Sequence, residues 1–128
     1  KARLLLSLAE RVNNMTLNEF KNKLKSNSEQ IEFTETIAVI EENYEFTPTP
    51  FTNGTLKNDE GQNSGSCKLF AFAKDQNLTK EETLTCFGSY YFEDVLKDPK
   101  GTGHQNIRNF MTSGFEGLKF ISFPLRKK

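Results

Sequence analysis

The stretch Tyr-Glu-Phe-Thr-Pro-Thr-Pro-Phe at residues 44–51 decides how this chain is organised. Pro48 and Pro50 lack a backbone N–H, fix their own φ and disfavour helical geometry in the residue before each of them. The chain must therefore run extended through this stretch. The following residues 52–65 are rich in Asn, Gly, Ser and Asp, a composition that predicts a long central loop.

Two amphipathic helices are predicted before this stretch. Thr16 and Glu19 have the spacing of a capping box, in which each side chain accepts a hydrogen bond from the other residue's backbone N–H. Apolar residues at helical spacing follow until a turn near Ser26. A second helix is expected to begin near Thr34, because apolar residues recur on one side of a helix from there to Tyr44.

Three further helices are predicted after the central loop. The first starts near Ser66, with Asn63 or Ser64 as its N-cap. The second runs from about residue 80 to 96, begins after a capping box of Thr79 and Glu82, and carries a regular apolar stripe. The third is shorter, from about residue 104 to 113, and ends at a glycine.

The C-terminal residues 118–123 are aromatic and β-branched enough to form a strand, which would pair with the extended residues 46–51. Residues 1–14 carry leucines at helical spacing and form a separate N-terminal amphipathic extension. The expected fold is mainly α. It is a compact single domain of five to six helices with a long central loop, and it allows one short two-stranded β pairing.

Composition excludes several classes of partner. Seventeen basic and seventeen acidic side chains cancel, so no long-range field attracts nucleic acid, and no nucleic-acid partner is expected. The longest apolar run, at residues 4–9, is too short to cross a bilayer, so no membrane span is predicted. Cys67 and Cys86 are the two cysteines, and a lone pair in a domain of this size indicates reduced thiols in a cytoplasm.

Four segments of the sequence resemble the HopJ type III effector family of small bacterial proteins. They are Asn-Tyr-Glu-Phe-Thr-Pro-Thr-Pro-Phe-Thr-Asn-Gly at 43–54, Gly-Gln-Asn-Ser-Gly-Ser-Cys-Lys-Leu-Phe-Ala-Phe-Ala at 61–73, Cys-Phe-Gly with Tyr-Tyr at 86–91, and His-Gln-Asn-Ile-Arg-Asn-Phe-Met at 104–111. The resemblance implies a HopJ-like domain at residues 15–123, with residues 1–14 before it and a basic tail at 124–128. It also implies delivery from the bacterial cytoplasm into a host cell.

The resemblance carries over no catalytic residue, so a chemical site has to be sought in the residues themselves. Cys67 lies near the expected start of a helix, where backbone amides and the helix dipole lower the pKa of a thiol. His104 is the one histidine and would act as its base, as in cysteine hydrolases. One departure is Gly103, where the resemblance implies an acidic residue, and this weakens a carboxylate-assisted role for His104.

Amide and hydroxyl side chains gather in two of these segments and suggest a pocket for a small polar ligand or anion at the loop from Gln62 to Lys68. The candidate ligand-binding residues are Gln62, Asn63, Ser64, Ser66, Lys68, Asn106 and Arg108. The competing interpretation is a hydrogen-bond network that holds a long loop in place. The spacing of one histidine and two cysteines fits no metal motif, so neither a metal nor another cofactor is expected.

The sequence therefore predicts a HopJ-like interaction protein without enzymatic activity, which binds an unidentified protein partner. Two alternatives stay open. One is a small cysteine-dependent enzyme that uses Cys67 and His104, and the other is a binder of small ligands or anions at the loop from Gln62 to Lys68. The oligomeric state does not follow from the sequence.

Overall fold

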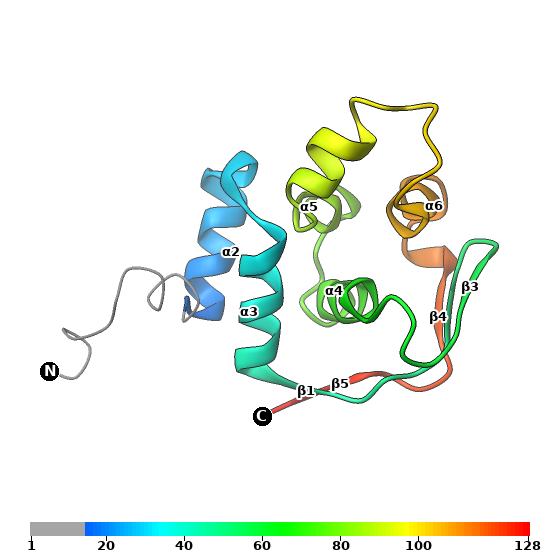
Figure 1. Ribbon diagram of the computed structural model, residues 1–128. Helices are drawn as coiled ribbons and strands as arrows, with labels where there is room; N and C mark the ends of the chain where they lie inside the picture. Colours follow the sequence, from blue (N-terminus) through cyan, green and yellow to red (C-terminus); the bar gives the residue numbers. More distant parts are fainter. Residues whose placement is uncertain (1–14) are drawn as a thin grey trace, which may run out of the picture.

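The structure is a computed structural model, and it describes residues 15–128. The N-terminal helix expected within residues 1–14 lies outside this range. The prediction of a mainly α fold is confirmed (Figure 1). The α-helices described are α2 (Leu17–Ser26), α3 (Phe33–Asn43), α4 (Ser64–Asp75), α5 (Lys80–Thr85) and α6 (Gln105–Ser113).

The starts of α2 and α5 follow the predicted capping boxes. The Thr16 hydroxyl accepts a hydrogen bond from the backbone N–H of Glu19, and the Glu19 carboxylate accepts one from the backbone N–H of Thr16. Thr79 and Glu82 make the same reciprocal pair before α5. A cap of this kind stabilises a helix by about 1 kcal/mol, because it satisfies backbone donors that have no partner within the helix.

Helix α4 is the centre of the core. Its residues 69–73 are fully buried on every side of the helix, including the rings of Phe70 and Phe72. Phe72 packs edge-on against Phe20 of α2 at 6.0 Å between ring centroids, and Phe70 packs against Phe110 of α6 at 4.9 Å. Aromatic pairs at these distances add stabilisation beyond the burial of their area. Phenylalanine rings thus tie α2 and α6 to α4.

The prediction of a long central loop was wrong in part, because these residues contain a β-hairpin. Strands β2 (Phe51–Asn53) and β3 (Leu56–Asn58) pair antiparallel around a turn at Gly54, whose φ is +61°. Strand β4 (Leu118–Phe120) pairs with the other edge of β2, with Phe51 opposite Phe120. This pairing is the one predicted for the C-terminal strand, shifted toward the end of the proline stretch.

A second small sheet was not predicted. Strand β1 (Tyr44–Phe46) pairs antiparallel with β5 (Leu125–Lys127), which lies within the basic tail at residues 124–128. In Figure 1 the sheet of β1 and β5 lies below the helices, and the three-stranded sheet lies to their right. The proline stretch connects β1 to β2 and so passes from one sheet to the other.

The single helix predicted at residues 80–96 is also wrong. Helix α5 ends at Thr85, and after a turn the chain forms η3 (Tyr90–Val95), a π-helix in which the Leu96 N–H bonds the Tyr91 carbonyl. The turn passes through Gly88 at φ +61°. This left-handed conformation ends a helix, and glycine adopts it without the strain of a Cβ. Short helices η2 (Ser28–Gln30) and η4 (Gly114–Gly117) complete the described elements.

Candidate functional site

Cys67 does not have the environment of a reactive thiol. It lies in the first turn of α4, as predicted, but only 2% of its surface is exposed. Burial raises the pKa of Cys67 to about 11, against the opposing effects of a hydrogen bond from the Thr49 backbone and of nearby Lys68. The expectation of a lowered pKa was wrong because desolvation of the thiolate outweighs the helix start.

His104 faces a different set of groups. Its Nε2 lies 3.1 Å from Oδ2 of Asp94, and its ring lies against Tyr90 at 5.2 Å between centroids. Asp94 thus provides a carboxylate beside His104, although position 103 carries a glycine instead of the expected acidic residue. Among residues 15–128, no hydrogen bond joins Cys67 to His104.

The predicted amide side chains do come together, as a buried network between the hairpin and the helix starts. Asn106 accepts hydrogen bonds at its Oδ1 from Nδ2 of Asn53 at 3.0 Å and from Nδ2 of Asn58 at 3.3 Å. Asn58 Oδ1 accepts in turn from Nδ2 of Asn106 at 2.9 Å and of Asn63 at 2.7 Å. Three of the four side chains are buried, so the network holds the hairpin against α4 and α6.

Two other candidates also brace loops. The Gln62 side chain accepts a hydrogen bond from the backbone N–H of Asp59. Arg108 donates from Nε to the Gly103 carbonyl at 2.6 Å and from one terminal nitrogen to the Asp98 carbonyl at 2.9 Å. Both therefore serve the loop-holding interpretation that the sequence left open.

Lys68 and Ser64 are likewise engaged within the fold. The Lys68 ammonium pairs with Glu41 at 2.9 Å and lies 4.9 Å above the centre of the Phe46 ring. The Ser64 hydroxyl donates to the Gly61 carbonyl at 3.3 Å. Neither Lys68 nor Ser64 therefore directs an unengaged polar group toward a shared ligand site.

A small cavity nevertheless remains where α4 and α6 begin, and we call it the cap pocket. Its volume is about 310 Å³. Asn63 and His104, the residues before the two helices, both have left-handed backbones with φ of 52° and 55°, and neither side chain caps its helix. Two helix starts without side-chain caps thus meet the same cavity. Its polar lining comes from Asn63, Ser66, His104, Gln105 and Asn106.

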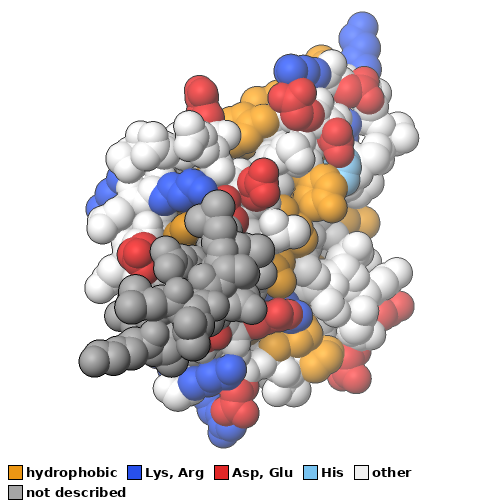
Figure 2. All heavy atoms as spheres, turned by 60° about the vertical axis from the view of Figure 1, so that its left-hand side comes forward, with side chains coloured by type: hydrophobic (Ala, Val, Ile, Leu, Met, Phe, Trp, Pro, Cys, Tyr) orange, Lys and Arg blue, Asp and Glu red, His pale blue; other side chains and the backbone are white. Residues whose placement is uncertain are grey.

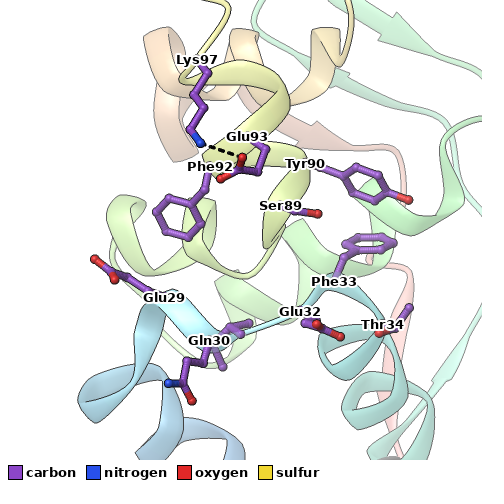
Figure 3. Close-up of a pocket in the computed structure, with 11 residues that line it drawn as sticks. Glu29, Gln30, Glu32, Phe33, Thr34, Ser89, Tyr90, Phe92, Glu93 and Lys97 are labelled. Carbon is purple, nitrogen blue, oxygen red and sulfur yellow. Dashed lines mark hydrogen bonds and ion pairs between the residues drawn. The ribbon is translucent and has the colours of Figure 1, made fainter.

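A larger surface feature was missed by the sequence analysis. Two adjoining hollows of about 680 and 480 Å³ share Phe33 and Thr34. The larger lies between the η2–α3 junction and η3, and the smaller continues along α3. We call them together the acidic groove. Figure 3 shows Tyr90 over Phe33 and the Phe92 ring pointing into the space between η3 and Glu29.

The groove is strongly acidic although the whole chain is neutral. Its lining contains five glutamates and one lysine, an excess of four negative charges, although one of the glutamates, Glu41, is also paired with Lys68 outside the lining. The lysine is Lys97, which pairs with Glu93 at 2.7 Å, as the dashed line in Figure 3 marks. The glutamates are Glu29, Glu32, Glu41, Glu42 and Glu93.

The rings of the groove are held from behind. Phe33 stacks on Phe87 at 6.0 Å with nearly parallel planes, and Tyr90 packs edge-on against Phe33 at 5.3 Å. Tyr90 contacts His104 on its other side, so one row of rings separates the groove from the cap pocket. Figure 2 shows the pale blue His104 beside hydrophobic side chains on this face.

Only part of this groove could be predicted from the sequence. The Tyr90-Tyr91 pair indicates one exposed ring, and Tyr90 is indeed 42% exposed. The break at Gly88 was not predicted, and it is this break that turns Tyr90 and Phe92 toward α3. Glu32 and Phe33 are distant from them in sequence, so no local pattern connects the two sides.

The described part of the chain contains neither a cluster of metal ligands nor a membrane-spanning helix. No three His, Cys, Asp or Glu side chains of residues 15–128 lie close enough together to hold a metal ion. No helix in this range is long and apolar enough to span a membrane.

Comparisons with known proteins agree with the resemblance of the four segments. No curated protein matches the sequence. A crystal structure described as that of VPA0580, a protein of unknown function, matches with a TM-score of 0.86 and 54% identity, over 88% of this chain and 93% of that chain. Residues 17–125 match the sequence model of the family described as HopJ type III effector protein. The chain therefore belongs to the HopJ family.

Proposed function

We propose that this HopJ protein is a non-enzymatic interaction protein that acts as a type III effector and binds a partner protein in the acidic groove. The observation that supports it best is the groove itself, about 680 Å³ in its larger part, in which the rings of Phe33, Tyr90 and Phe92 meet solvent. Exposed aromatic rings that are rigidly packed from behind are typical anchors of protein interfaces. The protein would be made in the bacterial cytoplasm and act after delivery into a host cell.

The charges of the groove indicate what the partner presents. Glu41 and Glu42 lie in the last turn of α3, where the helix dipole is negative, and Glu41 is offset there by its ion pair with Lys68. Glu42 is unfavourable at this helix end, which fits a role in binding. A partner segment with Lys or Arg around one large apolar side chain would match the glutamates and the rings together.

A displayed library of random short peptides tests this proposal, because no partner has to be known beforehand. Peptides selected on the full chain should be enriched in Lys and Arg together with one aromatic or leucine residue. Their affinity should fall at least tenfold for Tyr90→Ala, which removes an exposed ring without opening the core. Affinity should also fall for Glu93→Lys and as the salt concentration rises.

The matched control is Ile121→Ala, which removes another exposed apolar side chain on a different element. Selected peptides should bind this variant as they bind the natural sequence. Peptides that bind Tyr90→Ala without loss would place the interaction elsewhere and overturn the proposal.

The cysteine-enzyme alternative loses its main support. A thiol with a pKa of about 11 is almost entirely protonated at neutral pH, and Cys67 is too buried to meet a substrate without local opening. His104 has its own partner in Asp94.

A second candidate function is the binding of a small polar ligand or anion in the cap pocket. The observation in its favour is that Ser66, Gln105 and His104 line one cavity at two helix starts. Thermal-shift screening of phosphate, sulfate and carboxylate metabolites tests it, since a ligand at a hundred times its dissociation constant stabilises by roughly 2.7 kcal/mol. A hit that survives in the double variant Ser66→Ala, His104→Ala would not bind in this pocket.

A further inference from the structure

A second exposed apolar feature lies outside the groove, between the strands β4 and β5. Between β4 and β5 the chain runs Phe-Ile-Ser-Phe-Pro at residues 120–124. Ile121 is 80% exposed and Phe123 is 48% exposed, which makes them the most exposed large apolar side chains of the described residues. We call Phe120, Ile121 and Phe123 the apolar tip.

The tip is rigidly supported. The Phe123 ring packs edge-on against Phe120 at 5.9 Å, and Phe120 packs against the buried ring of Phe51 at 5.8 Å. The Ile121 backbone N–H bonds the Pro50 carbonyl, and the Ser122 N–H bonds the Thr49 hydroxyl. The fold thus keeps the Ile121 side chain exposed to water. Burial of this side chain against another surface would be favourable through the hydrophobic effect.

Basic side chains are close to the tip in the sequence, and Lys57 and Lys119 line a hollow of about 370 Å³ together with Phe120, Ile121 and one acidic residue, Asp59. The last twelve residues contain Lys119, Arg126, Lys127 and Lys128 and no acidic residue. Lys57 adds a fifth positive charge, because Lys57 and Lys119 both lie opposite Thr52 and so share one face of the three-stranded sheet. Arg126 and Lys127 pair with Glu45 and Asp75, but these pairs are largely exposed and hold the cations only weakly.

We infer that the apolar tip inserts into the headgroup region of an anionic lipid bilayer, with the basic residues near it held at the lipid phosphates. Ile121 and Phe123 lie on the connection between β4 and β5, so both can enter a flat and deformable surface while the two sheets stay intact. A second copy is a poorer occupant, because a symmetric contact would bring the same lysines of both copies together. Peripheral binding of this kind combines apolar burial with attraction between cations and anionic lipids.

Vesicle sedimentation tests this inference with the full chain. Vesicles of phosphatidylcholine with about one third phosphatidylglycerol should carry the protein into the pellet at low salt, whereas pure phosphatidylcholine vesicles should leave it in solution. The double variant Ile121→Ser, Phe123→Ser should lower the partition coefficient at least tenfold. Lys127→Gln and Lys128→Gln should each lower it about fivefold, and salt should weaken all binding.

Two controls keep the test specific to the tip. Tyr90→Ser removes an exposed ring of the acidic groove, and Lys100→Gln removes an exposed lysine outside the basic set, so both should leave the partition coefficient unchanged. Equal melting temperatures would show that all variants are folded.

Three results would overturn the inference. The first is a natural chain that stays in solution with anionic vesicles at low salt. The second is vesicle binding that the tip variants leave unchanged, which would assign the binding to other residues. The third is a dimer in light scattering that dissociates in the Ile121→Ser, Phe123→Ser variant, which would make the tip a contact between copies.

Discussion

Gly88 and Phe33 are packed so closely that a Cβ on Gly88 would stand 2.9 Å from the backbone nitrogen of Phe33. This contact joins the turn before η3 to the start of α3, and so it sets the two walls of the acidic groove against each other. Gly88 also has a left-handed backbone, with φ of +61°. Space and conformation therefore both require glycine here.

Gly88→Ala should lower the free energy of unfolding by about 2 to 4 kcal/mol, because it adds backbone strain and a clash with main-chain atoms that cannot move aside. Denaturant titration measures this. Gly103→Ala is the matched control, since no atom lies within 4 Å of its added Cβ, and it should change stability little. Equal stability of the two variants would contradict the close packing.

The asparagine network gives a second prediction. Asn106→Ala should destabilise the protein by about 2 to 3 kcal/mol, because the buried Asn58 amide loses its acceptor and Asn53 keeps only a carbonyl partner. Chemical denaturation checks the value. Asn18→Ala removes an exposed amide from α2 and should be nearly neutral. If Asn106→Ala destabilised the protein as little as Asn18→Ala does, the network would not contribute to stability.

Arg108→Ala should lower the melting temperature clearly, by about 3 to 6 °C, since it removes two hydrogen bonds that hold residues 98–103. Differential scanning calorimetry measures the shift. Arg126→Ala should have a smaller effect, because its ion pair with Glu45 is mostly exposed. An unchanged melting temperature for Arg108→Ala would show that the loop does not depend on this side chain.

Alkaline pH should unfold the protein more readily than neutral pH. Burial raises the pKa of Cys67 to about 11 and that of Cys86 to about 12, from an ordinary value of 9.0. A raised pKa means that the folded state keeps protons which the unfolded state releases. The stabilisation is therefore complete below about pH 9 and is lost as the pH rises toward about 12.

Urea midpoints between about pH 8 and pH 11 measure this loss. In the variant Cys67→Ala, Cys86→Ala the fall with pH should be smaller, whatever its stability at neutral pH. Both natural thiols should also resist alkylation at neutral pH until the chain is unfolded. Rapid alkylation of folded Cys67 would contradict the burial and revive the enzymatic alternative.

The parts of the fold that were predictable are those with local physical causes. The capping boxes at Thr16 and Thr79, the helix before Tyr44 and the extended proline stretch all follow from neighbours within four residues, and all are confirmed. The candidate amides Asn63 and Asn106 were also brought together as expected, although as part of a network that braces the loop.

The parts that were missed depend on contacts between distant segments. An apolar stripe continues through residues 80–96, but Gly88 lies against the η2–α3 junction and must turn there. The hairpin of β2 and β3 is polar in sequence, and it forms because Asn53 and Asn58 find a buried partner in Asn106, about fifty residues away. No pattern of period two or 3.6 contains that information.

The pairing of Tyr44 with Lys127 has a consequence for how the chain is made. During synthesis β1 emerges early, but its partner strand is among the last described residues to leave the ribosome, and β4 reaches β2 only slightly before it. The nascent chain therefore carries two unsatisfied strand edges for most of its synthesis, next to aromatic side chains that have not yet been covered. We expect chaperones that shield extended apolar segments to matter most in this interval, and release to coincide with the arrival of the C-terminal strand.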